Sequence, residues 1–183
     1  MEDRFPALLI RNIYNNADRR YLSWMEPFVD AGYAVVAQDC RGRHDSDGVW
    51  DPYMCELNDG FDTHEWVGRQ PWCDGQVGTF GVSYPGFTQT LPATLRSPAL
   101  KALVPIASQQ DNWGHHRISG ALHWSVALFF ANMIGRTMQT EPLALLDQAA
   151  VQRHLPLATV IEEHVGYPLE FFRGVVEHDR YDE

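Results

Sequence analysis

The chain has 183 residues, of which 45% are hydrophobic and six are tryptophan, and its formal net charge is −10. This length and composition suffice for an ordinary domain with a sizeable core, and they exclude a disordered protein. The acidic balance argues against binding to nucleic acid or to an anionic membrane surface. No run of about 20 apolar residues is present that would span a bilayer.

The first half of the sequence alternates between buried strands and amphipathic helices. Short apolar runs predict four strands, at residues 7–11, 33–38, 77–82 and 102–106. Helical spacing of apolar residues predicts three helices, at residues 18–31, 58–69 and from 84 to about 96. This alternation is typical of a parallel sheet with helices on both faces, and ligands bind at the carboxyl ends of such strands.

The second half of the sequence has a different pattern, which begins at about residue 107. Residues 120–135 are strongly apolar and aromatic, and no further buried strand is evident. Three successive helices are predicted, at residues 142–153, 155–165 and 168–178. We therefore expect an α/β fold in which residues 1–110 form part of a sheet domain and residues 111–183 form a helical region.

Three cysteines, Cys40, Cys55 and Cys73, are widely spaced and form no C-x-x-C pair. An odd number at this spacing argues against a disulfide scaffold or a zinc site and predicts reduced thiols. The first six residues carry no charged-then-apolar signal pattern. We therefore expect a cytoplasmic protein.

The segment from Val77 to Gly86 carries the strongest functional signal in the chain. A β-forming run ends at Gly81-x-Ser83, and a helix is predicted to follow directly. A serine at such a strand-to-helix turn exposes its hydroxyl beside the N-terminal amides of the helix, as a nucleophile requires. The alternative is an ordinary helix N-cap, because serine is a preferred cap and Pro85 suits the first helical turn.

Several collinear motifs accompany this turn. They are Arg11-Asn12-x-Tyr14, Gly32-Tyr33-Ala34-Val35-Val36, Asp39-x-Arg41-Gly42, Ser46-x-Gly48, Asp59-Gly60-x-Asp62-Thr63-x-x-Trp66, Trp72-Cys73-x-Gly75-x-Val77-Gly78 and Gly81-x-Ser83-Tyr84-x-Gly86. Together they resemble the cocaine esterase and X-Pro dipeptidyl-peptidase family, over roughly residues 7–135. One departure concerns the general hydrolase motif Gly-x-Ser-x-Gly, in which Pro85 replaces the second glycine and Gly86 follows it.

The resemblance implies an α/β-hydrolase, with a mostly parallel sheet and flanking helices followed by a helical cap. It implies a serine hydrolase that cleaves esters or amides through an acyl-serine intermediate. In such a site Ser83 is the nucleophile, and the backbone amide of Tyr84 and the hydroxyl of Tyr14 donate to the oxyanion. A tyrosine packed at a strand end is the alternative for Tyr14. The family usually has proline before this tyrosine, and Ile13 predicts a less rigid loop.

The resemblance also assigns an aromatic group to the wall of the acyl pocket. Its members are Trp113, Trp124, Phe129 and Phe130. A hydrophobic wall suits a substrate with an apolar acyl or prolyl portion, and packing inside the cap is the alternative for the same residues.

In this family the acid and the histidine of the triad come after the cap, so we expect them beyond residue 183. Substitutes within the chain are Asp111 with His115 or His116, and His178 with Asp179. Exposed or core histidines are favoured over a catalytic role, and none is assigned here.

No metal or organic cofactor is implied. His44, Asp45 and Asp47 lie in a loop of turn-forming composition without ligand spacing, and Asp39 and Arg41 are expected to form a structural ion pair. The expected partner is a small-molecule ester or amide, together with either a second copy of the chain or a complementing C-terminal part. Two alternatives remain open: an α-amino acid ester hydrolase or β-lactam acylase, and a truncated chain that binds without catalysis.

Overall fold

The computed structural model describes residues 4–109, 111–125, 147–165, 170–178 and 180. Internal contacts divide the chain into two compact units, residues 1–110 and residues 111–183, and each unit is described by itself.

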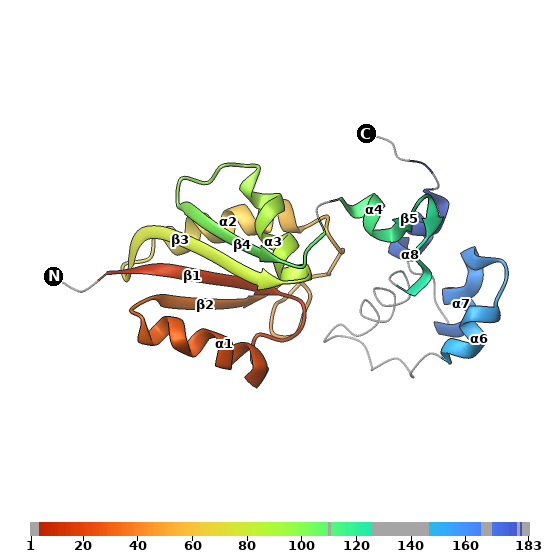
Figure 1. The fold of residues 1–183 in the computed structure, drawn as a ribbon, viewed down its shortest axis with the longest axis horizontal. Helices are drawn as coiled ribbons and strands as arrows, with labels where there is room; N and C mark the ends of the chain where they lie inside the picture. Colours follow the sequence, from red (N-terminus) through yellow and green to blue (C-terminus); the bar gives the residue numbers. More distant parts are fainter. Residues whose placement is uncertain (1–3, 110, 126–146, 166–169, 179, 181–183) are drawn as a thin grey trace. The chain divides into compact units, whose positions relative to one another are not determined.

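The first unit is built on a four-stranded parallel sheet with the strand order β2-β1-β3-β4 (Figure 1). The strands are β1 (Phe5–Asn12), β2 (Ala34–Asp39), β3 (Cys73–Val82) and β4 (Leu100–Ile106). All four predicted strands are present. The β3 strand starts earlier than predicted because Cys73 pairs with Phe5 of β1, ahead of a register shift between Phe5 and Ala7.

Three helices cover the two faces of this sheet, as the sequence predicts. They are α1 (Arg19–Asp30), α2 (Glu56–Gly68) and α3 (Tyr84–Ala93). The α1 helix lies on one face, and α2 and α3 lie together on the other (Figure 1). The chain adds β2 on one side of β1, and then β3 and β4 on the other side. Because crossovers between parallel strands are right-handed, the helices that make these two sets of connections must lie on opposite faces of the sheet. In open parallel sheets, ligands bind outside the carboxyl ends of the strands at such a reversal of strand order, which here lies between β1 and β3.

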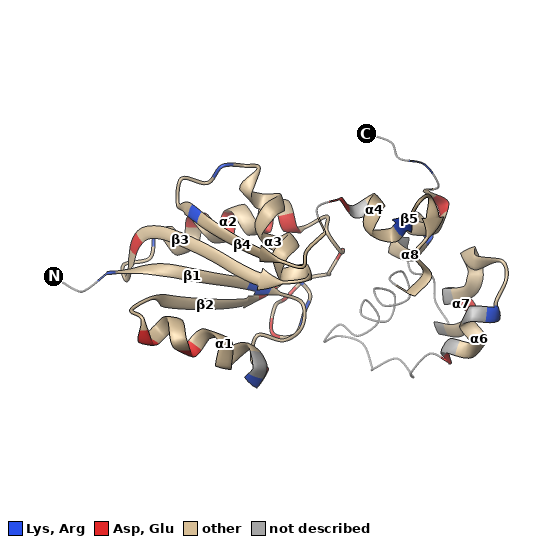
Figure 2. Ribbon diagram, in the orientation of Figure 1, with Lys and Arg blue, Asp and Glu red and all other residues tan. Residues whose placement is uncertain are grey.

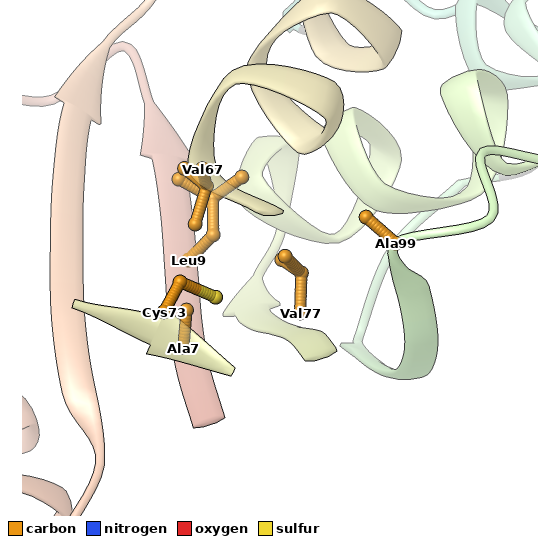
Figure 3. Packing of buried hydrophobic residues seen from close by; sticks show 6 residues of the cluster. All are labelled: Ala7, Leu9, Val67, Cys73, Val77 and Ala99. Atoms are coloured by element: carbon orange, nitrogen blue, oxygen red, sulfur yellow. The ribbon is translucent and has the colours of Figure 1, made fainter. Parts of the chain in front are cut away.

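A contiguous apolar cluster joins the sheet to the helices on its α2 face. Figure 3 shows its members gathered between β1, β3 and the end of α2: Ala7, Leu9, Val67, Cys73, Val77 and Ala99. Complete burial of a Leu or Val side chain contributes about 1.5–3 kcal/mol to the free energy of unfolding, so this cluster fixes the two central strands together.

The β4 strand forms one edge of the sheet, and much of its side-chain surface is open. Val104 and Ile106 are 53% and 45% exposed. Among the described residues β4 pairs only with β3, which leaves its outer row of backbone donors and acceptors without a strand partner.

The second unit consists of short elements. They are α4 (Asn112–His116), β5 (Arg117–Ile118), β6 (Ala121–Leu122), α6 (Gln148–Arg153), a 3-10 turn (Leu157–Thr159), α7 (Val160–Val165) and α8 (Glu170–Glu177). The α6 and α8 helices lie within the predicted ranges 142–153 and 168–178, whereas the predicted helix 155–165 is divided into the 3-10 turn and α7, and α4 was not predicted. The β5–β6 hairpin was not predicted, because strands of two residues show no periodicity. Residues 126–146, which include Phe129 and Phe130, lie outside the described residues.

Charged residues are dispersed over the described parts of both units, and the basic ones occur mostly singly along the ribbon (Figure 2). Cys40 and Cys73 are buried free cysteines, and Cys55 is a partly buried one. Within the described ranges, no helix is both long enough and apolar enough to cross a bilayer.

Candidate active site

Ser83 lies in the sharp turn between β3 and α3. Its backbone angles, φ 66° and ψ −126°, fall in a region that non-glycine residues rarely adopt. The glycines on either side make this turn sterically feasible. A Cβ on Gly81 would lie 2.4 Å from the Pro85 Cβ, and one on Gly86 would lie 2.3 Å from the Ser108 Cβ. The glycine at position 86, rather than 85, is therefore required by close packing against the loop after β4.

The Ser83 hydroxyl does not act as a helix cap. Ser83 occupies the N-cap position of α3, yet its side chain makes no capping hydrogen bond. It is exposed, and its Oγ lies 3.3 Å from the Tyr14 Oη. The backbone holds the turn in place, because the Ser83 amide donates to the Ile106 carbonyl and the Gly86 amide donates to the Ser83 carbonyl, both at 2.9 Å. The structure thus argues against the capping alternative for this serine.

Tyr14 faces Ser83 because its loop follows β1, the strand beside β3. The Asn12 Oδ1 accepts from the Tyr14 amide at 2.7 Å. The Arg43 Nε donates to the Ile13 carbonyl at 3.2 Å, and the Ile13 side chain is completely buried. The Tyr14 ring stacks nearly parallel to that of Tyr21. These contacts hold the loop that carries Tyr14, and the expectation of a less rigid loop stays a prediction.

The Tyr14 hydroxyl is in the protonation state that an oxyanion donor needs. Burial raises the pKa of Tyr14, while hydrogen bonds with the Ser83 side chain and the Tyr84 backbone act in the opposite direction. The phenol therefore keeps its proton at neutral pH. The same two bonds bring three groups together: the Ser83 hydroxyl, the Tyr14 hydroxyl and the Tyr84 amide.

No histidine of the described residues is hydrogen-bonded to Ser83. In the first unit the His44 Nε2 contacts the Ile13 carbonyl at 3.2 Å, and His64 is completely buried. In the second unit the Asp111 carboxylate accepts from the amides of Trp113 and Gly114, both at 3.0 Å, and so caps α4. This contact gives Asp111 a structural role.

The described aromatic residues assigned to the acyl pocket have partners inside the second unit. The Trp124 ring packs edge-on against Phe172, with ring centroids 5.8 Å apart. The Arg117 guanidinium lies 6.0 Å from the Trp113 ring centroid. The structure leaves Phe129 and Phe130 outside the described residues, so their place in the pocket stays a prediction.

The loop after β2 is a set of turns, as its composition predicts. The Gly42 amide donates to the Asp47 carbonyl at 3.0 Å, and the Ser46 amide donates to the Arg43 carbonyl at 2.8 Å. The prediction that Asp39 and Arg41 form an ion pair is wrong. The Arg41 guanidinium binds Asp59 on α2, with contacts of 2.6 and 2.9 Å.

Asp39 accepts from the amide of Asn16 in the loop that carries Tyr14, at 2.8 Å. Arg11, so far named only within a motif, forms a buried ion pair with Glu56, a residue that no sequence pattern indicated. A charged residue at the end of an apolar strand was the available signal, because Arg11 must find a partner there.

A parallel sheet with a serine at a strained strand-to-helix turn defines an α/β-hydrolase fold. The whole chain, residues 1–183, matches the X-Pro dipeptidyl-peptidase (S15) family and therefore belongs to it. The resemblance found in the sequence is thus confirmed.

Two kinds of relative support this placement. The chain is 39% identical over 168 residues to cocaine esterase from Rhodococcus sp. (strain MB1 Bresler), an alignment that covers 88% of this chain and 29% of that protein. A solved α-amino acid ester hydrolase superposes with a TM-score of 0.77 at 25% identity, over 98% of this chain and 34% of the other. An aminopeptidase from a marine sediment Thaumarchaeota archaeon gives a TM-score of 0.67 at 26% identity, with the same coverage. The chain spans about a third of the length of these relatives.

Proposed function

We propose that Ser83 is the nucleophile of a hydrolase that cleaves esters or amides through an acyl-serine intermediate. The observation that carries the proposal is the 3.3 Å approach of the Tyr14 hydroxyl to an exposed Ser83 hydroxyl, outside the carboxyl ends of β1 and β3. The strained backbone of Ser83 supports it, because strain of this kind concentrates at functional sites. Membership of a family that includes X-Pro dipeptidyl-peptidases supports the reaction class.

In the proposed reaction the Ser83 Oγ attacks the carbonyl carbon of the substrate while a general base takes its proton. The carbonyl oxygen becomes an oxyanion, which accepts hydrogen bonds from the Tyr14 hydroxyl and the Tyr84 amide. The leaving alcohol or amine departs with the proton, and water then attacks the acyl-enzyme. No described imidazole is hydrogen-bonded to Ser83. The proposed reaction therefore needs a general base, and an acid that orients this base, which are not among the described contacts of Ser83.

The proposed partner is a small-molecule ester or amide. Similarity to an esterase, an amino ester hydrolase and an aminopeptidase leaves three substrate types to compare. The amino ester candidate is favoured by one observation, the TM-score of 0.77 to the α-amino acid ester hydrolase. A panel of a neutral acyl ester, an α-amino ester and an Xaa-Pro amide would separate the three by their kcat/KM values.

The test of the proposal is covalent labelling in the protein that contains this chain. A fluorophosphonate probe should modify Ser83, as located by peptide mass spectrometry, and p-nitrophenyl acetate should be hydrolysed. Ser83→Ala should abolish labelling and lower turnover by about 10⁴-fold or more. The matched control is Ser97→Ala, which removes a hydroxyl from a buried residue in the loop between α3 and β4. Turnover that survives in Ser83→Ala would refute the proposal and assign the hydrolysis to another group.

A further inference from the structure

The Tyr84 side chain is buried and hydrogen-bonded in the interior, although its backbone amide belongs to the proposed oxyanion site. The ring is 1% exposed. Its hydroxyl donates to the Glu56 Oε1 at 3.1 Å and accepts from the Tyr53 amide at 2.9 Å. Burial and the charge of Glu56 raise the pKa of Tyr84, so the phenol keeps its proton and remains a donor.

The Glu56 carboxylate also forms an ion pair with Arg11 of β1. The Glu56 Oε2 and the Arg11 Nη1 are 3.0 Å apart, and the two side chains are only 1% and 3% exposed. Arg11 is fixed further by the bond from its Nε to the Gln38 Oε1 at 2.8 Å. Its own carbonyl accepts from the Thr88 Oγ1 of α3 at 3.0 Å.

These contacts join the two segments that carry the proposed oxyanion donors. Arg11 lies three residues before Tyr14 on the same strand and loop, and Tyr84 carries the other donor. Glu56, the first residue of α2, contacts both segments. A buried ion pair is poor evidence for stability, since desolvation offsets its Coulomb energy, but it can select one arrangement of the groups around it.

Given the nucleophile proposed above, we infer that Glu56 is a positioning residue, which sets the spacing between the Tyr84 amide and the Tyr14 hydroxyl. One carboxylate oxygen fixes Tyr84 through its phenol, and the other fixes β1 through Arg11. An oxyanion site requires its donors in place before the reaction, and a displacement of about 1 Å can cost as much as 100-fold in rate. Loss of this link should therefore lower kcat and leave KM nearly unchanged.

The inference is tested with Tyr84→Phe, which removes one hydroxyl and keeps the ring and the amide. The measurement is p-nitrophenyl acetate hydrolysis by the protein that contains this chain, with urea unfolding of each variant alongside. We expect kcat to fall about tenfold, with KM changed less than twofold. In a Tyr14→Phe background the same change should have a much smaller effect, because one of the two positioned donors is already absent.

The matched control is Ser97→Ala. The Ser97 hydroxyl donates to Glu65 of the same α2 helix at 2.6 Å and is also buried. This variant therefore removes a buried hydroxyl-to-carboxylate bond of α2 that does not touch Tyr84 or Arg11. If Tyr84→Phe fails to fold, Glu56→Gln replaces it, because the amide oxygen still accepts from Tyr84 while the charge opposite Arg11 is lost.

Ser83→Ala is measured in parallel and separates the two levels of the proposal. An inactive Ser83→Ala, with a fall in kcat for Tyr84→Phe but not for Ser97→Ala, supports the positioning role. An inactive Ser83→Ala with equal kcat values for Tyr84→Phe and Ser97→Ala overturns the positioning role and leaves the nucleophile in place. Turnover that survives Ser83→Ala overturns the nucleophile, and the positioning role with it.

Discussion

The two units of the chain differ in what holds them together. In residues 4–109, strands and helices of 6 to 13 residues form a layered unit with an apolar cluster between the sheet and α2, and parallel pairing brings Leu8 beside Gly78. In the described part of residues 111–183, the longest helix has eight residues and the strands have two. There a buried Arg117 donates to the carbonyls of Val175 and His178 and so links the hairpin to the end of α8. Catalytic residues that need a fixed geometry are best placed on a scaffold of the first kind. Residues that recognise variable ligands tolerate a scaffold of the second kind.

The largest expected effect tests whether the apolar cluster belongs to the first unit alone. Leu9→Ala removes a side chain that is 1% exposed and should lower the free energy of unfolding by about 3 kcal/mol. Hydrogen exchange should accelerate in β1 and β3 and not in α8. Phe172→Ala, which truncates a buried ring of α8, is the reciprocal variant. Equal acceleration in both units from Leu9→Ala would mean that they unfold as one.

The next effect concerns the chemistry that the first unit is proposed to carry. Tyr14→Phe should lower kcat by about 100-fold, because one oxyanion donor is lost, and should change stability little. Steady-state hydrolysis of p-nitrophenyl acetate gives kcat. Tyr33→Phe makes the same chemical change at a residue that is 40% exposed. A similar kcat for the two variants would assign Tyr14 to packing at the strand end.

Acid should destabilise both units over the same pH range. Burial and the nearby Arg11 lower the pKa of His64 to about 4, although Glu65 acts in the opposite direction. Burial, with His115, His123 and Arg117 nearby, likewise lowers the pKa of His116 to about 4.

The folded state therefore favours neutral imidazoles, and the unfolded state binds more protons between about pH 6.5 and pH 4. Stability is complete above pH 6.5 and decreases towards pH 4, by about 3 kcal/mol for His64. Urea unfolding at pH 7 and pH 4.5 measures this decrease, and His64→Gln should make it smaller. An unchanged pH dependence in this variant would show that His64 contributes nothing to it.

The smallest expected effect concerns the exposed ion pair of the first unit. The Arg41 side chain is 52% exposed where it meets Asp59. A double-mutant cycle with Arg41→Gln and Asp59→Asn should give a coupling energy below about 1 kcal/mol. A larger value would mean that the surface charges, and not packing alone, distinguish the first unit from the second.

Local patterns in the sequence were sufficient for the strands, the helices and the turn of Ser83. Apolar runs, helical spacing and Gly81-x-Ser83 each depend on neighbouring residues. Pairing between distant segments was not accessible in this way. The Glu56 partner of Arg11 lies 45 residues away in the sequence, and Arg41 binds Asp59 on α2 instead of the nearby Asp39.

The position of Tyr14 shows both the use and the limit of the sequence. The family motif predicted that its hydroxyl would serve Ser83, and the structure brings the two oxygens within 3.3 Å. The reason lies in the strand order, since β1 and β3 are neighbours whose connections leave to opposite faces. Strand order is a property of the whole fold, and local composition does not reveal it.

The backbone of Ser83 has a consequence for any attempt to optimise this sequence. Glycine adopts a φ of 66° without steric strain, so Ser83→Gly should stabilise the fold by about 1 kcal/mol. Selection for thermal resistance alone would thus favour glycine at this position and remove the proposed nucleophile. A library of variants ranked only by folding would be enriched in inert proteins, and heat resistance would need to be screened together with turnover.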